Sequence, residues 1–166
     1  SLISNTNSDA IDSDFSKGTI INSKFYNIGI LGGGDAIDVS GSSVIVEDTY
    51  FNVVSDKAIS VGEKSEVKLI NVNIENSSVG VASKDLSLTT IIDSSIKNSK
   101  FADLMAYKKK NEYGGGIIKT SNTKLENIKS VKSDLNSLIM VDEVKLKNNQ
   151  FDIEDLYKTI MKPSRK

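Results

Sequence analysis

One segment occurs twice in the chain, and this duplication limits the possible folds more than any other feature of the sequence. Residues Val67–Asn76 are followed, 22 positions later and without a gap, by Thr89–Asn98, which has the same spacing of apolar and polar side chains. A period between 20 and 50 residues indicates a repeat architecture, in which each unit buries its apolar side chains against the next. The remaining segments are therefore best compared in register with these two.

Four other segments fit the same pattern, which gives six turns at offsets of 22 to 29 residues. They are Ile20–Phe25, Val46–Phe51, Thr120–Leu125 and Leu146–Phe151. One column of equivalent positions is apolar: Phe25, Phe51, Ile74, Ile96, Leu125 and Phe151. A second column is mostly apolar: Ile20, Val46, Leu69, Ile91, Thr120 and Leu146.

The column between these two is polar in every turn. Its members are Asn22, Asp48, Asn71, Asp93, Asn122 and Asn148. Asn and Asp tolerate left-handed backbone and bond to their own backbone, so this column predicts a corner between two strands. A further asparagine column predicts a ladder of amide hydrogen bonds along the stack; it consists of Asn27, Asn76, Asn98 and Asn127.

A third strand precedes each pair, centred on Ile11, Ile37, Ile59, Val81 and Leu104. Three short strands per turn, repeated in register, predict parallel stacking with rungs about 4.8 Å apart. A β-sandwich with chance alternation is the alternative. Over residues 9 to 151 the pattern resembles the right-handed parallel β-helix repeat family, the pectate-lyase-like superfold. The predicted fold is all-β, a right-handed parallel β-helix of about six coils with a short C-terminal capping helix.

Two segments depart from the repeat. Residues 107–116 form an insertion expected to protrude as a loop, within a solenoid predicted for residues 1–151. Residues 152–166 change to a helical period with Asp152 as N-cap and Pro163 as terminator. The apolar positions of this helix are Ile153, Leu156, Tyr157, Ile160 and Met161. We expect it to cover the open end of the solenoid; a partner-binding or membrane-surface helix is the alternative.

The composition of the chain excludes several kinds of site and function. The chain of 166 residues has no Cys and no His, and its net charge is −1. It therefore has no disulfides or thiolate metal sites, and no basic face that suits nucleic acid. No apolar run is long enough to span a membrane. The first residue is Ser, which suggests a piece of a longer protein, with preceding coils or another chain covering the N-terminal end; an oligomer would also account for an uncapped end.

Acidic side chains gather in the first two turns. Asp9, Asp12 and Asp14 of the first turn lie opposite Asp35 and Asp38 of the second, about one rung apart. Asp12, Asp35 and Asp38 are therefore the candidate ligands for Ca²⁺, a cation that prefers oxygen donors. A solvated acidic face that binds no cation is the alternative. No other cofactor is indicated.

The β-helix resemblance implies a polysaccharide lyase or hydrolase as one function. Such lyases use an Arg or Lys base, but the only Arg is Arg165 in the tail, which leaves Lys57, Lys64, Lys84 and the lysines of the loop. The resemblance implies, for a hydrolase of this fold, a cluster of Asp residues together with a Gly-His-Gly segment. This chain has no His and so lacks that segment. We therefore assign no catalytic residue.

The 107–116 insertion is the candidate ligand-binding segment, since aromatic and cationic side chains together suit anionic sugars or phosphate. The residues concerned are Tyr107, Lys108, Lys109, Lys110 and Tyr113. A solvated loop is the alternative. Tyr26 and Tyr50 are a second candidate surface for stacking sugars.

Together these features favour a non-enzymatic structural or carbohydrate-contacting β-helix module of a secreted, surface or larger multidomain protein. The alternatives are an enzyme acting on an acidic polysaccharide and a segment of an oligomeric fibre or spike. A polysaccharide or protein partner is expected at the N-terminal open end.

Overall fold

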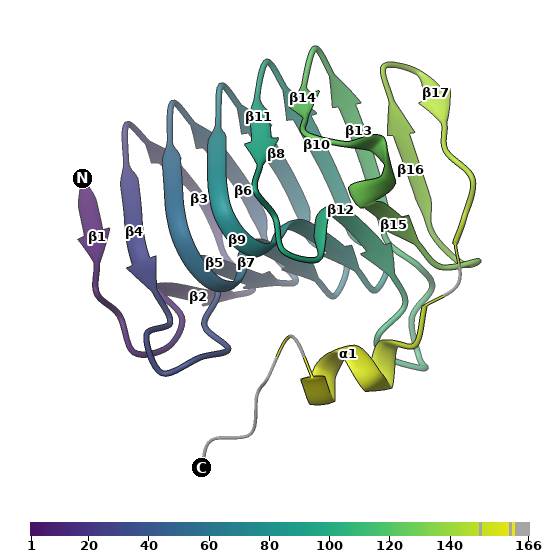
Figure 1. Cartoon of the computed structure of the whole chain (residues 1–166), viewed down its shortest axis with the longest axis horizontal. Coiled ribbons are helices and arrows are strands. Elements are labelled where there is room, and N and C mark those ends of the chain that lie inside the picture. Colours follow the sequence, from purple (N-terminus) through teal and green to yellow (C-terminus); the bar gives the residue numbers. More distant parts are fainter. Residues whose placement is uncertain (150, 160, 162–166) are drawn as a thin grey trace.

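The structure is a computed structural model that describes residues 1–149, 151–159 and 161. The chain winds into a parallel β-solenoid of about six turns, which confirms the predicted β-helix (Figure 1). Each turn contributes one strand to each of three faces. None of the described helices is long and apolar enough to cross a membrane.

We name the faces A, B and C in the order in which a turn passes through them. Face A contains β2 (Ile11–Asp14), β5 (Ile37–Ser40), the second halves of β7 (Tyr50–Gly62) and β9 (Asn73–Lys84), β12 (Ala102–Tyr107) and β15 (Val131–Ser133). Face B contains β3 (Lys17–Ile21), β6 (Ser43–Glu47), β8 (Glu66–Ile70), β10 (Leu88–Ile92), β13 (Ile117–Ser121) and β16 (Leu138–Val141). Face C contains β1 (Leu2–Ser4), β4 (Lys24–Ile28), the first halves of β7 and β9, β11 (Ser95–Lys97) and β14 (Lys124–Leu125).

The strand register agrees with the predicted columns through five turns. Val46 pairs with Leu69 on face B, and Phe51 pairs with Ile74 on face C. On face A, Ile37 pairs with Ile59. These columns point inward and form one continuous core, because parallel in-register stacking places each apolar side chain on its own copy in the next turn.

The polar column forms the corner between faces B and C, as predicted. Five of its predicted members have φ between 49° and 51°, in the left-handed region: Asn22, Asp48, Asn71, Asp93 and Asn122. The chain can turn there at little cost because Asn and Asp adopt this conformation more readily than other non-glycine residues.

The last turn has a different register from the predicted one. Strand β16 pairs with β13, so that Val141 lies beside Thr120, and Asp142 takes the corner position with φ of 45°. The predicted Leu146 segment instead turns back through β17 (Val144–Lys145), which pairs antiparallel with β16. Leu146 packs against the core, and the Asn149 amide bonds to the backbone of β15. This return covers the C-terminal end of the solenoid.

The predicted asparagine ladder is present only in part. Asn27 donates to Asn5 at 2.8 Å, but the equivalent position of the next turn is Val53, which has no amide. Asn127 does not continue the column; its side chain caps the 3₁₀ helix η1 (Ile128–Ser130). The corner column supplies comparable pairs, Asp48 with Asn71 and Asp93 with Asn122.

A column of serines lies at the corner between faces A and B, and it was not among the columns predicted from the repeat. Ser42 Oγ, Ser65 Oγ and Ser87 Oγ each accept a hydrogen bond of 3.0 to 3.1 Å from the backbone N–H of the equivalent serine in the preceding turn. All three serines are buried. A corner N–H that leaves the strand ladder needs another acceptor when it is buried, and the hydroxyl provides one.

The predicted C-terminal helix is present as α1 (Ile153–Thr159), and Asp152 is its N-cap, since its carboxylate accepts from the Asp155 N–H at 3.0 Å. However, α1 does not cover the open end of the solenoid. Helix α1 lies alongside the solenoid and not at its end (Figure 1). Leu156 and Met161 pack against an apolar patch of β9 and β12 on the outer side of face A. The end is already covered by the return after β16, so the helix buries its apolar side elsewhere. Ile160 and 162–166, including Pro163, lie outside the described residues.

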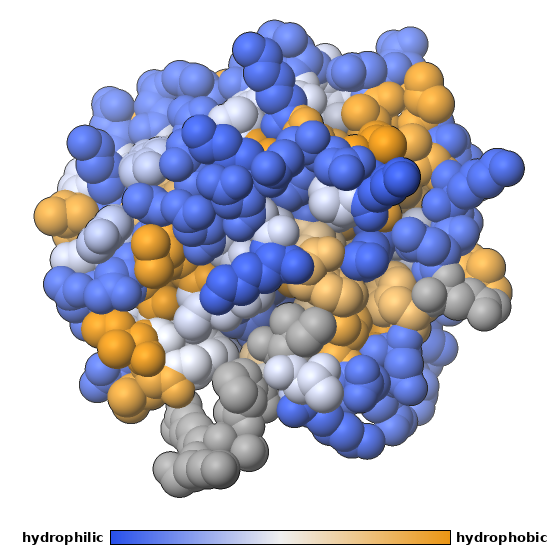
Figure 2. Space-filling view, in the orientation of Figure 1, coloured by the Kyte–Doolittle hydropathy of each residue, from blue (hydrophilic) through white to orange (hydrophobic). Residues whose placement is uncertain are grey.

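The molecular surface in this orientation is mostly hydrophilic, with apolar residues confined to separate patches (Figure 2). The most exposed large apolar side chains lie near both ends of the solenoid: Phe15, Leu31 and Leu2 in the first two turns, and Leu135 in the C-terminal part.

Candidate functional site

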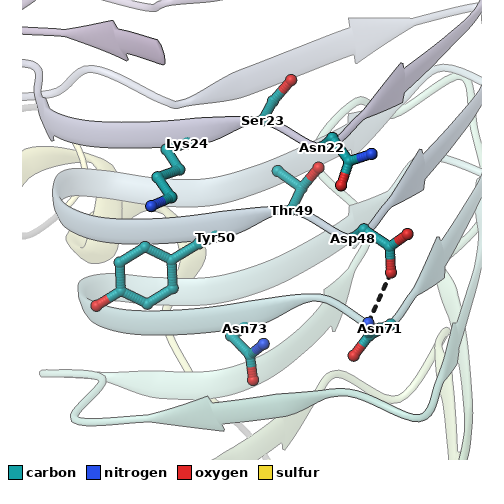
Figure 3. Close-up of a pocket in the computed structure, with 8 residues that line it drawn as sticks. All are labelled: Asn22, Ser23, Lys24, Asp48, Thr49, Tyr50, Asn71 and Asn73. Carbon is teal, nitrogen blue, oxygen red and sulfur yellow. Dashed lines mark hydrogen bonds between the residues drawn. The ribbon is translucent and has the colours of Figure 1, made fainter. Parts of the chain in front are cut away.

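A shallow polar groove runs along the corner between faces B and C. It has a volume of about 230 Å³, and we call it the corner groove. Its lining residues come from three successive turns: Asn22, Ser23, Lys24, Asp48, Thr49, Tyr50, Asn71 and Asn73. Figure 3 shows two rows, with the Asx side chains at the corner itself and Lys24, Tyr50 and Asn73 beside them. The repeat produces this arrangement, because equivalent positions stack at each rung.

Hydrogen bonds hold part of the groove and leave part of it open. The Asn71 amide donates to Asp48 Oδ1 at 2.6 Å, and the Tyr50 hydroxyl donates to Glu75 Oε2 at 3.3 Å. Burial and the Glu75 carboxylate raise the pKa of Tyr50. Among the described residues, the side chains of Asn22 and Lys24 make no hydrogen bond or ion pair, so they can bind a ligand. Tyr26, the other tyrosine expected at this face, is about half exposed.

The predicted ligand-binding loop is not a single exposed surface. Tyr107 is the last residue of β12; it is fully buried, and its hydroxyl lies 2.7 Å from that of Tyr157 on α1. The backbone of Lys109 and Lys110 is held by Asp85, whose carboxylate accepts both N–H groups.

The side chains of the loop are also engaged. Lys110 forms an ion pair with Glu63, and the Lys109 ammonium lies 4.9 Å from the centre of the Tyr157 ring. The centre of the Tyr113 ring lies 5.8 Å from the Lys64 ammonium. Lys108 is held through its backbone, since its N–H donates to Asp134. These hydrogen bonds and this ion pair hold the loop against neighbouring turns.

The three predicted metal ligands do not converge. Asp12 and Asp38 are neighbours in register on face A, as predicted, with Asp12 exposed and Asp38 partly exposed. Asp35 is buried and bonds to Lys57 instead. Across residues 1–149, 151–159 and 161, no group of three acidic side chains could hold a metal ion. Two effects raise the pKa of Asp12: the larger is desolvation by burial, and the next is repulsion from the Asp38 carboxylate.

A buried charged cluster lies on the outer side of face A, made of Asp35, Asp56 and Lys57. The Lys57 ammonium lies 3.2 Å and 3.4 Å from the two oxygens of Asp35, and 2.8 Å from Asp56 Oδ2. The three residues are at most 5% exposed. A β-bulge between Val54 and Lys57 shifts the strand register at this point.

Burial perturbs both kinds of charge in this cluster. Desolvation raises the pKa of Asp56 to about 7, although the Lys57 cation opposes the shift. Burial by itself lowers the pKa of Lys57, but the carboxylates of Asp35 and Asp56 outweigh it and raise the pKa above its ordinary value. In the described part of the chain, Asp56 Oδ1 accepts no hydrogen bond. A buried group without a partner is costly, and such perturbed groups are candidates for function.

Lys84 is a second buried lysine on the same face. Its ammonium donates to Ser60 Oγ at 2.8 Å and lies 3.9 Å from Asp38 Oδ1. Burial lowers its pKa, because the nearest carboxylate is too distant to compensate fully. The sequence offered Lys57 and Lys84 as candidate bases without any sign that both are buried. The signal that could have joined Asp35 to Lys57 is their separation of 22 residues, one period of the repeat.

The N-terminal end of the solenoid exposes part of the core. A hollow of about 170 Å³ there is lined mainly by apolar residues of β2, β3, β5 and β6, among them Ile11, Ile20 and Val39. The partner expected at this end stays a prediction.

No protein-family model, no curated protein and no solved structure matches the chain. The fold defines the class of the protein as a parallel β-solenoid.

Proposed function

We propose that the protein is a non-enzymatic carbohydrate-contacting module of a secreted or cell-surface assembly, and that the corner groove binds the sugar. The observation that carries this proposal is the repeated row of amide and carboxylate side chains beside the Tyr50 ring. Amides and carboxylates offer paired donors and acceptors that suit vicinal hydroxyl groups. An aromatic ring offers an apolar face for the C–H side of a sugar.

The charge of the groove indicates the kind of sugar. Lys24 contributes a cation without an acidic partner among the described residues, whereas Asp48 is already bonded to Asn71. A uronic-acid unit would place its carboxylate near Lys24 and its hydroxyls along the Asx row. The groove spans three turns, so a short oligosaccharide fits better than a single sugar.

Calorimetric titration with neutral and uronic-acid oligosaccharides tests this proposal. The double variant Asp48→Ala/Asn71→Ala should weaken binding at least about tenfold, which corresponds to about 1.4 kcal/mol. The matched control is Asp93→Ala/Asn122→Ala, which removes the same 2.6 Å pair from the same column outside the groove. Equal losses in both variants, or no binding by the wild type to any oligosaccharide, would contradict the proposal.

A second candidate function is eliminative cleavage of a uronic-acid polysaccharide, and Lys84 is the observation in its favour. A lysine with a lowered pKa is more readily neutral and can remove the proton next to a carboxylate. Such cleavage creates a double bond that absorbs ultraviolet light. Absorbance that rises with the wild type and not with Lys84→Gln would support this function, and no rise with any uronic-acid polymer would oppose it.

A further inference from the structure

The buried cluster of Asp35, Asp56 and Lys57 has the geometry of a reaction centre whose product is part of the protein itself. We propose that the Lys57 ammonium nitrogen and the Asp35 carboxyl carbon join in an intramolecular amide bond, with Asp56 carrying the protons. The bond would link the second and third turns of the solenoid covalently on face A.

The reacting groups are already in contact. Nζ of Lys57 lies 3.2 Å and 3.4 Å from the two oxygens of Asp35, so it is close to the carbon that carries both. The measured distances are to the two oxygens, and the reacting carbon lies between them. Groups held so that such atoms meet in the right orientation react as though at effective concentrations of roughly 10⁵ to 10⁸ M. Such proximity can drive an amide condensation that does not proceed between free side chains in water.

Backbone hydrogen bonds keep the Asp35 side chain and main chain in place. The Lys57 N–H donates to Asp35 Oδ1 at 2.9 Å, and the Asp35 N–H donates to Asp9 Oδ1 at 2.7 Å. The first of these donors is aimed at the oxygen that becomes negative when the carbon is attacked. A fixed donor at that position stabilises the developing charge.

The surroundings favour the neutral product over the ion pair. Asp56 and Lys57 are 1% and 3% exposed. Tyr157 also lies near the cluster: burial raises the pKa of Tyr157 to about 12, and the Lys57 cation opposes this shift. Keeping separate charges in such a site carries a desolvation penalty that an uncharged amide does not have. Water, which would hydrolyse the bond, has little access.

Asp56 is suited to the proton transfers. Its Oδ2 lies 2.8 Å from Nζ and takes a proton from the ammonium group, which leaves a neutral amine. The amine attacks the Asp35 carbon, and Asp56 passes that proton, and then a second one from the nitrogen, to Asp35 Oδ2. One C–N bond forms and one C–O bond breaks. Nitrogen loses two protons, Oδ2 leaves as water, and Asp56 returns to its starting state, so no oxidant or activating reagent is needed. Its raised pKa, about 7, makes Asp56 a better proton acceptor than an ordinary aspartate.

A covalent link here has a clear physical role. The chain contains no cysteine, so no disulfide can join its turns. The amide would close a loop between Asp35 and Lys57, which are 22 positions apart in the sequence. A cross-link of this kind restricts the unfolded chain in the same way as a disulfide does.

Intact-mass measurement under denaturing conditions, after incubation of the folded protein, tests the proposal. We expect wild type to be lighter than its sequence by one water, and a protease digest to contain one branched peptide joining the Asp35 and Lys57 fragments. Asp56→Asn and Lys57→Arg should keep the full mass. The control Asp38→Asn alters a neighbouring carboxylate that does not touch Lys57, and it should retain the loss of water.

Each other result overturns the proposal. A wild type of full mass after prolonged folded incubation rules out the bond, even if the variants fail to fold. A loss of water confined to one unbranched peptide indicates a cyclic imide instead. A branched peptide that still forms in Asp56→Asn removes the role of Asp56. None of these results depends on whether the corner groove binds sugar.

Discussion

Phe25 and Phe51 stack on successive turns with ring centroids 4.7 Å apart and planes inclined by 11°. Both rings are fully buried, and they occupy the same column of face C. The spacing is close to the distance between hydrogen-bonded strands, so the backbone ladder sets the ring separation. The core is therefore a set of stacked columns, and each member is supported by its copies above and below.

Removing one ring should be costly. We expect Phe51→Ala to lower the free energy of unfolding by about 3 to 5 kcal/mol, because it leaves a cavity between Phe25 and Ile74. Denaturant unfolding measures this. Tyr26→Ala, on the adjacent, half-exposed position of β4, should change the free energy far less. Similar losses for the two variants would show that the column is not the main support of face C.

The serine column should behave as a set of backbone acceptors. Ser65→Ala removes the acceptor of the Ser42 N–H, which stays buried, and we expect a loss of about 1 to 3 kcal/mol in the free energy of unfolding. Ser43→Ala is the control, because Ser43 is exposed next to the same corner. Hydrogen exchange at the Ser42 amide provides a local readout, and unchanged protection in Ser65→Ala would contradict the assigned role.

Asp56 should make stability fall as pH rises. Its ordinary pKa is 3.8 and its folded-state pKa is about 7, so between these values the folded protein keeps a proton that the unfolded chain releases. The free energy of unfolding should therefore decrease from about pH 4 to about pH 7, and this contribution should level off above. Asp9 and Asp12, whose pKa values burial also raises, act in the same direction. The difference between wild type and Asp56→Asn isolates the residue, and parallel pH curves for the two proteins would contradict the assignment.

Helix α1 should depend on its contacts with face A. Tyr157→Phe leaves the buried Tyr107 hydroxyl without its 2.7 Å partner, at an expected cost of about 1 to 3 kcal/mol. Lys158→Ala, the next residue on the same helix, removes only an exposed ion pair with Glu154 and should have little effect. The free energies of unfolding of the two variants, together with hydrogen exchange in β12, measure how much the Tyr157–Tyr107 contact contributes. Equal effects would mean that α1 contributes no specific packing through Tyr157.

The repeat in the sequence predicted most of the solenoid. Parallel in-register stacking places equal residues on equal residues, so columns such as Val46, Leu69 and Ile91 define the strand register directly. The Asx column defined a corner because few other residues adopt left-handed backbone readily. Comparison of equal positions failed in the last turn, where Leu146 fits the pattern but the chain reverses after Asp142. A terminal turn has no following copy to enforce its register.

The candidate sites were less predictable. The corner groove combines columns that the sequence identified, but its depth depends on how Lys24, Tyr50 and Asn73 project from neighbouring strands. The loop lysines have a composition that suits anions, yet contacts with Asp85 and Glu63, from other turns, determine their position.

The repeat predicts the architecture, because equal apolar and Asx positions at each period favour like-on-like stacking. The places where charge is buried depend on the folded chain. A pattern marks Lys57 and Asp35 as polar and one period apart, but only the fold shows the register shift in β7 next to Lys57 and the Tyr157 side chain of α1 near the Lys57 cation. The position of α1 also depends on the fold. An amphipathic pattern predicts that one side of the helix is buried, but it does not predict which surface covers that side.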